Sequence, residues 1–229
     1  NKAKVEPVIA DGAVFHETIA ECVKGRDAVI TIVGYPQDVE DVYLGEGKIL
    51  ESADPGTYLI DMTTTSPALA QRIFQQGRQR GLRVLDAPVT GGDIGARAGT
   101  LSILVGGEAA DYQACRPLLA AMGTNLSHQG PAGCGQHAKL ANQIMIAGTL
   151  SGLCEGLRYA EAKGLDGRKL LGALATGAAG SKQMDALGGK ILTGDHAPGF
   201  FLKHFVKDMT LALGESRDSG LSLEVLGQV

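Results

Sequence analysis

The first residues that could do chemistry are a lysine and two amides. Lys139, Asn142 and Gln143 lie within segment 136–163, which no proline interrupts. On a helix, residues three and four positions apart share one face, and this face continues with the apolar Leu150. A lysine beside a buried stripe can lose water and then donate a proton or stabilise an alkoxide. The alternative is a solvated lysine on a helix flank. Its place near a helix N-terminus, where the dipole disfavours cations, modestly favours the functional interpretation.

A second candidate is the Thr90–Gly91–Gly92 segment. It follows the apolar run 83–88, at the carboxyl edge where open sheets bind ligands. A hydroxyl beside two unobstructed backbone N–H groups can bind an anionic oxygen. A glycine-rich turn that merely reverses the chain explains the same residues equally well.

The remaining motifs, and motifs that the sequence lacks, mainly exclude other kinds of site. The segment 205–212, which contains Lys207 and Asp208, predicts a helix with a charged face, and by itself a solvated face is the simpler interpretation. The five histidines show no metal-ligand spacing, so we expect no metal site. Neither a G-x-S-x-G motif nor a P-loop occurs, which argues against hydrolases and NTPases.

A regular scaffold is needed to position these residues. Short apolar runs typical of strands buried on both faces lie at residues 28–33, 57–62, 83–88, 101–105 and, more weakly, 125–128. Helical patterns lie between them, one opened by Ser66 and Pro67 and closed at Gly81. Strand–helix alternation predicts an α/β fold with a doubly wound, Rossmann-type parallel sheet.

The pattern changes after Gly135. A helix over residues 136–163 would be about 42 Å long, and glycine turns separate helical patterns beyond it. We therefore predict a Rossmann-type dinucleotide-binding domain over residues 1–129 and an all-α substrate and dimerisation domain over 130–229. Apolar residues on more than one face of the long helix predict a homodimer or homotetramer.

Composition narrows the class of protein. The chain has 229 residues and a formal net charge of -4, which provides no basic surface for nucleic acid. No apolar run approaches a membrane span, and no signal-peptide core is present, so we expect a soluble, cytoplasmic protein without a membrane partner. The four cysteines form no C-x-x-C pair, which predicts free thiols.

Five segments together resemble a known family, the β-hydroxyacid dehydrogenases. This family includes 3-hydroxyisobutyrate dehydrogenase and tartronate semialdehyde reductase (2-hydroxy-3-oxopropionate reductase), and 6-phosphogluconate dehydrogenase is a more distant relative. DAPVTGGDIGARAGTL resembles the family's substrate-binding signature, and GCGQHAKLANQ resembles its catalytic-helix signature. TIVGYPQDVEDVY, IDMTTTSP and VKDMTLAL match in order and spacing.

The resemblance implies an NAD(P)-dependent oxidoreductase that interconverts a short β-hydroxyacid and its semialdehyde. Lys139 would be the general acid that protonates the carbonyl oxygen, and the base in the reverse direction. Asn142, with Gln143 behind it, would orient the substrate and the lysine. The Thr90–Gly91–Gly92 segment would hold the substrate carboxylate.

The resemblance also implies where the cofactor, NAD or NADP, would bind. Tyr35, Pro36 and Thr64 would line it, and Lys207, supported by Asp208, would approach its nicotinamide end. The family's first strand and G-x-G-x-x-G turn have no counterpart in these residues, and Asn1 aligns just after the family's second strand.

Two other functions are compatible with the sequence. One is a non-catalytic helical assembly or ligand-binding fragment of this family. The other is an imine or nitronate reductase on the same scaffold, against which Lys139 argues because imine reductases usually replace this lysine. Gln143, where some relatives carry a second asparagine, favours a small semialdehyde over a phosphorylated sugar acid.

Overall fold

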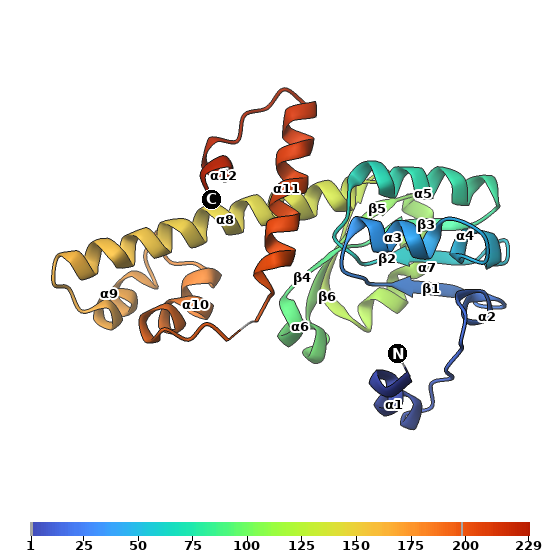
Figure 1. The fold of residues 1–229 in the computed structure, drawn as a ribbon, viewed down its shortest axis with the longest axis horizontal. Coiled ribbons are helices and arrows are strands. Elements are labelled where there is room, and N and C mark those ends of the chain that lie inside the picture. Colours follow the sequence, from blue (N-terminus) through green and yellow to red (C-terminus); the bar gives the residue numbers. More distant parts are fainter. Residues whose placement is uncertain (1, 198) are drawn as a thin grey trace. The chain divides into compact units, whose positions relative to one another are not determined.

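The computed structural model describes residues 2–197 and 199–229, with side chains from residue 5 onward, and contains two compact units. The first is Asn1–Lys139 and the second is Leu140–Val229. Helix α8 (Cys134–Ala162) begins in the first unit and continues into the second (Figure 1). The boundary predicted from sequence, between residues 129 and 130, precedes this helix and stays a prediction.

A mixed six-stranded sheet forms the centre of the first unit. Its strands are β1 (Ala28–Thr31), β2 (Tyr58–Asp61), β3 (Arg83–Asp86), β4 (Val89–Thr90), β5 (Leu101–Gly107) and β6 (Gly123–Gly130). The strands run in the order β1-β2-β3-β5-β4, and β6 pairs with β5. Each of the five predicted strands is present, and the Rossmann-type α/β class is confirmed.

The sheet is not parallel throughout. β1, β2 and β3 pair in parallel, as do β5 and β6, but β5 runs antiparallel to β3 and β4. The reason is local, because the chain after β3 extends as β4 and turns back through the short helix α6 (Gly92–Ala98) without a crossover. An alternation of short apolar runs does not record this reversal.

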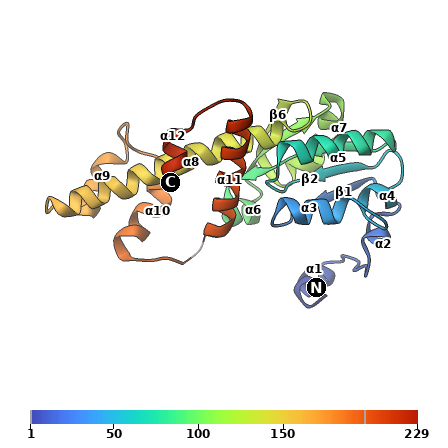
Figure 2. The ribbon, with the colours of Figure 1, turned by 45° about the horizontal axis from the view of Figure 1, so that its top comes forward.

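Helices cover both faces of this sheet (Figure 2). The helices on one face are α2 (Ile19–Val23), α3 (Pro36–Tyr43), α4 (Ile49–Ser52) and α5 (Pro67–Gln79), and α7 (Ala109–Ala120) packs on the other. Adjacent residues Leu59 and Ile60 of β2 point into opposite cores, and both are fully buried. Burial on both faces explains the continuous apolar runs seen in the sequence.

Local signals set the helix ends. Ser66 caps α5, because its side chain accepts a hydrogen bond from the Leu69 N–H at 3.3 Å, and Pro67 opens the helix as expected. Thr18 and Glu21 form a capping box at the start of α2. The remaining helix of this unit, α1, covers Lys2–Ala10.

The described residues of the second unit form helices and connecting loops, without a strand. It contains the rest of α8 together with α9 (Gly167–Leu174), α10 (Lys182–Thr193), α11 (Leu202–Asp218) and α12 (Glu224–Gln228). One core joins α8 to α11 and α12 through Leu140, Phe205 and Leu226, and a second core joins α8 to α10 through Leu157 and Met184. The predicted all-α region opened by a long helix is thus confirmed.

Candidate active site

Two segments predicted to line a cofactor follow parallel strands of the first unit. Tyr35 precedes α3, its N–H donates to Asp38 Oδ2 at 2.9 Å, and its side chain is 37% exposed. Thr64 follows β2, and the N–H of Val33 donates to Oγ1 of the adjacent Thr63 at 2.9 Å. The segments after β1 and β2 are therefore tied together at the carboxyl edge of the sheet, where open α/β sheets bind ligands.

A buried carboxyl group supports this edge. Asp61, the last residue of β2, accepts hydrogen bonds at Oδ1 from the Thr31 hydroxyl at 3.0 Å and from the Thr63 N–H at 3.1 Å. Burial raises the pKa of Asp61 to about 6, against the lowering effect of these donors. The Thr31 hydroxyl also hydrogen-bonds the buried Tyr43 hydroxyl at 2.8 Å. These hydrogen bonds hold together the ends of β1 and β2, which the segments predicted to line the cofactor follow.

The Thr90–Gly91–Gly92 segment is not a simple reverse turn. Thr90 ends β4, opposite Ser102 of β5, and α6 begins at Gly92. Gly91 has φ +131° and Gly92 has φ +63°, backbone conformations that side-chain-bearing residues rarely adopt. Both glycines are exposed, so the strand-to-helix junction presents its backbone outward. This geometry is compatible with anion binding, which stays a prediction.

Asp86, at the end of β3, organises the start of α8. Its Oδ1 accepts from the Gly133 N–H at 2.8 Å, and its Oδ2 accepts from the Gln136 N–H at 2.9 Å. Burial raises the pKa of Asp86, while these backbone donors act in the opposite direction. A Cβ atom on Gly106 or Gly135 would lie 2.5 Å from Asp86 Oδ1 or 2.6 Å from its carbonyl oxygen, respectively. Glycine at both positions lets the helix start this close to the sheet.

Gln136 completes that arrangement. It is fully buried, and its side-chain amide bonds in both directions: Nε2 donates to the Thr63 carbonyl at 2.8 Å, and Oε1 accepts from the Thr65 N–H at 2.9 Å. The residues on either side of Thr64 are thereby held to the first turn of α8. The residue types and spacing of the sequence indicate no function for Asp86 or Gln136, although both lie inside the two quoted signatures.

The lysine and two amides singled out from sequence lie on α8 as predicted. Lys139 is 7% exposed and Gln143 is 2% exposed, so both belong to the buried side of the helix. Asn142 Nδ2 donates to Gln143 Oε1 at 2.8 Å. The expectation that this face is buried, rather than a solvated flank, is confirmed for Lys139.

Within the second unit a chain of polar contacts extends from these amides to α11. Gln143 Nε2 donates to Asp208 Oδ2 at 2.7 Å, and Lys207 Nζ lies 3.1 Å from Asp208 Oδ1. Asp208 is 1% exposed. Asp208 therefore supports Lys207, and it also holds Gln143. The cofactor contact predicted for Lys207 stays a prediction.

The residue types at the carboxyl edge of the sheet are those that a nicotinamide dinucleotide needs. The fit rests on three observations: two loops that follow parallel strands, main-chain groups fixed by Thr63 and Gln136, and exposed apolar side chains at Ile32 and Tyr35. A flat ring and a ribose need this combination of apolar surface and hydrogen-bonding groups. The described residues contain no group of three or more His, Cys, Asp or Glu side chains that could hold a metal ion.

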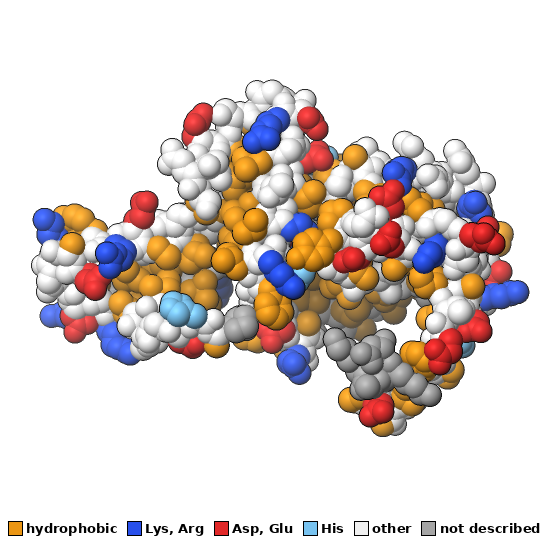
Figure 3. All heavy atoms as spheres, viewed as in Figure 1, with side chains coloured by type: hydrophobic (Ala, Val, Ile, Leu, Met, Phe, Trp, Pro, Cys, Tyr) orange, Lys and Arg blue, Asp and Glu red, His pale blue; other side chains and the backbone are white. Residues whose placement is uncertain are grey.

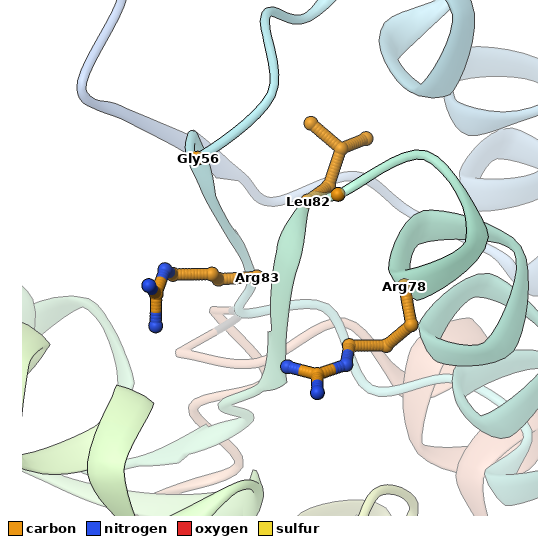
Figure 4. Close-up of a pocket in the computed structure, with 5 residues that line it drawn as sticks. Gly56, Arg78, Leu82 and Arg83 are labelled. Atoms are coloured by element: carbon orange, nitrogen blue, oxygen red, sulfur yellow. The ribbon is translucent and has the colours of Figure 1, made fainter.

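A separate hollow of about 410 Å³ lies at the opposite, amino-terminal edge of β3 (Figure 4). Arg78 at the end of α5 and Arg83 at the start of β3 line it. The carboxylate of the buried Asp111 lies 2.7 Å from Arg83 and 3.9 Å from Arg78, so it compensates their charge. None of the predicted site residues lines this hollow, and we assign it no role in catalysis.

Two family models together match almost the whole chain. Residues 1–130 match the NAD-binding domain of 6-phosphogluconate dehydrogenase, and residues 133–229 match the NAD-binding domain of NADP-dependent 3-hydroxyisobutyrate dehydrogenase. These descriptions agree with NAD or NADP as the cofactor.

The individual proteins that the chain resembles are also oxidoreductases of this kind. The chain is 48% identical to an uncharacterized oxidoreductase, YkwC, of Bacillus subtilis, over 96% of this chain and 76% of that protein. It is 34% identical to 2-hydroxy-3-oxopropionate reductase of Escherichia coli, over 95% of this chain and 75% of that one. Among solved structures, 3-hydroxyisobutyrate dehydrogenase of Mycobacterium tuberculosis with L-serine superposes with a TM-score of 0.88 at 27% identity, covering 99% of this chain and 79% of that one.

None of the described helices is both long and apolar enough to span a bilayer. The four cysteines are all free, as predicted. The two family models, the curated relatives and the shared fold converge on one assignment: the chain belongs to the β-hydroxyacid dehydrogenase family of NAD(P)-dependent oxidoreductases.

Proposed function

We propose that the protein interconverts a short β-hydroxyacid and its semialdehyde, of the glycerate and tartronate semialdehyde type or the 3-hydroxyisobutyrate and methylmalonate semialdehyde type, with Lys139 as the general acid and base. The observation that carries this proposal is the burial of Lys139 on α8, with Asn142 and Gln143 three and four residues further on. A relative named 2-hydroxy-3-oxopropionate reductase and a structural neighbour crystallised with L-serine, itself a β-hydroxyacid, support this substrate class.

The proposed chemistry divides simply between cofactor and protein. When bound, a reduced nicotinamide would supply a hydride to the carbonyl carbon of the semialdehyde. Lys139 donates a proton from Nζ to the carbonyl oxygen, so that a neutral hydroxyl forms. In the oxidative direction Lys139 accepts the hydroxyl proton. Asn142, oriented by its hydrogen bond to Gln143, positions the reacting oxygen beside the lysine.

Recognition of the substrate carboxylate is assigned to the Thr90–Gly91–Gly92 segment. A hydroxyl and two backbone N–H groups are donors of the kind that bind a carboxylate, and such charge-assisted hydrogen bonds are stronger than neutral ones. Tyr35, Pro36 and Thr64 are proposed to line the cofactor, and Lys207 to interact with it, as the family resemblance implies. Asp208 keeps the Lys207 side chain in place through their 3.1 Å ion pair.

The decisive experiment compares the full-length protein with its Lys139→Ala variant. Oxidation of NADH and NADPH is followed with tartronate semialdehyde and with methylmalonate semialdehyde. Loss of a general acid is expected to lower kcat roughly 10²–10⁴-fold while the cofactor still binds. Equal turnover by the two proteins would disprove the role of Lys139, and failure of the wild type to bind either cofactor would favour the assembly fragment considered above.

We also propose a homodimer or homotetramer. In the second unit large apolar side chains gather over α8, α9 and α10 (Figure 3). Exposed members of this set include Tyr159, Leu165 and Leu174. Exposed apolar surface of this kind is typical of an interface. Light scattering tests the proposal, which a monomeric mass would overturn. Cytoplasmic location remains a prediction from the sequence.

A further inference from the structure

Gln136 occupies a position that packing alone would fill with an apolar side chain. It is 0% exposed, yet both ends of its amide are hydrogen-bonded, to the Thr63 carbonyl at 2.8 Å and to the Thr65 N–H at 2.9 Å. These two bonds are to main-chain atoms on either side of Thr64. Burying an amide is favourable only when its polar atoms are satisfied, so this side chain specifies one position of segment 63–65 relative to the helix.

The same residue is anchored at its own main chain. The Gln136 N–H donates to Asp86 Oδ2 at 2.9 Å, while the Gly133 N–H donates to Asp86 Oδ1 at 2.8 Å. The first turn of α8 is thus fixed to the end of β3 and to the loop after β2. All of these residues belong to the first unit, as does Lys139, which lies three residues further along α8.

We infer that Gln136 is a positioning residue that sets the distance between the segment carrying Thr64 and the Lys139 side chain. The inference rests on the proposed function, in which Thr64 contacts the cofactor and Lys139 delivers the proton. Hydride and proton must reach the two atoms of one carbonyl group, so the two delivering groups need a fixed separation. Misplacement by about 1 Å can cost roughly 10²-fold in rate.

The Gln136→Glu variant tests this inference because its effect is reversible with pH. One carboxyl oxygen can still accept from the Thr65 N–H. The other now faces the Thr63 carbonyl, to which a carboxylate has no proton to donate, whereas a protonated carboxyl group does. Burial favours the protonated form at mildly acidic pH. We expect kcat relative to wild type to fall about 10²-fold at pH 8 and to recover substantially at pH 5.5.

Other titratable groups face the same region, so each value is taken as a ratio to wild type at the same pH. Asp86 bonds the Gln136 N–H, Asp61 bonds the Thr63 N–H, and Lys139 follows on α8. These groups are present in both proteins, and their own titration largely cancels in the ratio. The matched control is Gln75→Glu, the same change at an exposed position of α5, for which the ratio should stay near one.

Binding supplies a readout that does not require turnover. The affinity for NADH or NADPH, measured by fluorescence titration, should be weakened in Gln136→Glu at pH 8 and restored at pH 5.5, because segment 63–65 loses and regains one of its two anchors. A ratio of kcat and of affinity that is unchanged across this range would overturn the inference.

A second variant covers failure of Gln136→Glu to fold. Gln136→Met has a similar length but makes neither hydrogen bond, so its kcat should be low at every pH without recovery. A folded Gln136→Met protein with wild-type kcat would equally overturn the inference. The outcomes are separable, because wild-type turnover in Lys139→Ala contradicts the proposed function, whereas an inactive Lys139→Ala with unaffected Gln136 variants contradicts only the positioning role.

Discussion

Gln143 and Asp208 are joined by a 2.7 Å hydrogen bond although they lie 65 positions apart in the sequence. Gln143 is 2% exposed and Asp208 is 1% exposed. Asp208 also pairs with Lys207, so one carboxylate holds an amide of α8 and a cation of α11. A buried carboxylate is stable only when its oxygens are compensated in this way, and Asp208 therefore ties the two helices into one polar cluster.

Removal of Asp208 should be costly. The Asp208→Ala change removes the carboxylate that forms an ion pair with Lys207 and accepts a hydrogen bond from Gln143, in a location where water is largely excluded. We expect a loss of about 3 kcal/mol in the free energy of unfolding, together with reduced kcat because Asn142 is oriented through Gln143. Urea unfolding measures the first effect. Asp218→Ala, at the exposed end of α11, is the control and should differ little from wild type.

The raised pKa of Asp61 predicts a pH-dependent stability. Its pKa is about 6 in the folded protein and near 3.8 when unfolded, so the native state binds the extra proton between these values. The contribution of Asp61 is therefore present at low pH and is lost as pH rises from about 4 to about 6, by up to about 3 kcal/mol.

The Asp61→Asn variant should remove that dependence. Asparagine Oδ1 can accept the two hydrogen bonds that Asp61 Oδ1 accepts from Thr31 and Thr63, and it carries no charge to bury. The stability of the variant relative to wild type should rise between pH 4 and pH 7, as measured by urea unfolding at several pH values. Asp41→Asn, on the exposed face of α3, should show no such trend. Parallel pH profiles for Asp61→Asn and wild type would contradict the prediction.

Gly106 should tolerate no side chain. A Cβ atom there would lie 2.5 Å from Asp86 Oδ1 and 2.7 Å from the Gly135 nitrogen. Neither atom can move aside easily, because Asp86 Oδ1 accepts a hydrogen bond from the Gly133 N–H and the Gly135 nitrogen belongs to the main chain. Gly106→Ala should therefore displace the start of α8 and lower the free energy of unfolding by about 2 kcal/mol or more. Gly189→Ala, inside α10 with no atom within 4 Å of the added Cβ, should be neutral or stabilising by about 0.5–1 kcal/mol. Thermal unfolding of the two variants provides the comparison.

Thr90→Val tests the proposed carboxylate contact. Valine has the shape of threonine and, like it, favours a β-strand, but it lacks the hydroxyl group. A lost hydrogen bond to a charged group corresponds to roughly a 10–100-fold increase in KM for the semialdehyde, with a much smaller change in KM for the cofactor. Thr124→Val on the exposed part of β6 is the matched control. Equal KM values for Thr90→Val and wild type would remove Thr90 from the proposed site.

The sequence predicted elements well where a periodic signal exists. The five strands, the Ser66 cap of α5 and the long helix were all found close to their predicted positions. The antiparallel direction of β5 could not be predicted, because an apolar run of five residues carries no information about strand direction. β4 has only two residues, which is too short for an alternating pattern.

The candidate site was predicted where its residues lie close in sequence. Lys139, Asn142 and Gln143 form one helical cluster, so spacing alone brought them together. The roles of Gln136 and Asp86 could not be predicted, because their partners are main-chain atoms about 50 to 70 residues away in the sequence. The three threonines of segment 63–65 do not predict these hydrogen bonds, because any residue type other than proline offers the same main-chain groups and only the fold brings them to Gln136.

The side-chain amide of Gln136 hydrogen-bonds the Thr63 carbonyl and the Thr65 N–H, and neither bond involves a threonine side chain. Every residue except proline at position 65 offers the same N–H group, so neither bond constrains which side chain stands between them at residue 64. Exchange of residue 64 alone would therefore leave both hydrogen bonds of the Gln136 amide in place. Under the proposed function, the separation between the hydride donor and the proton donor would then be kept when the side chain at residue 64 changes.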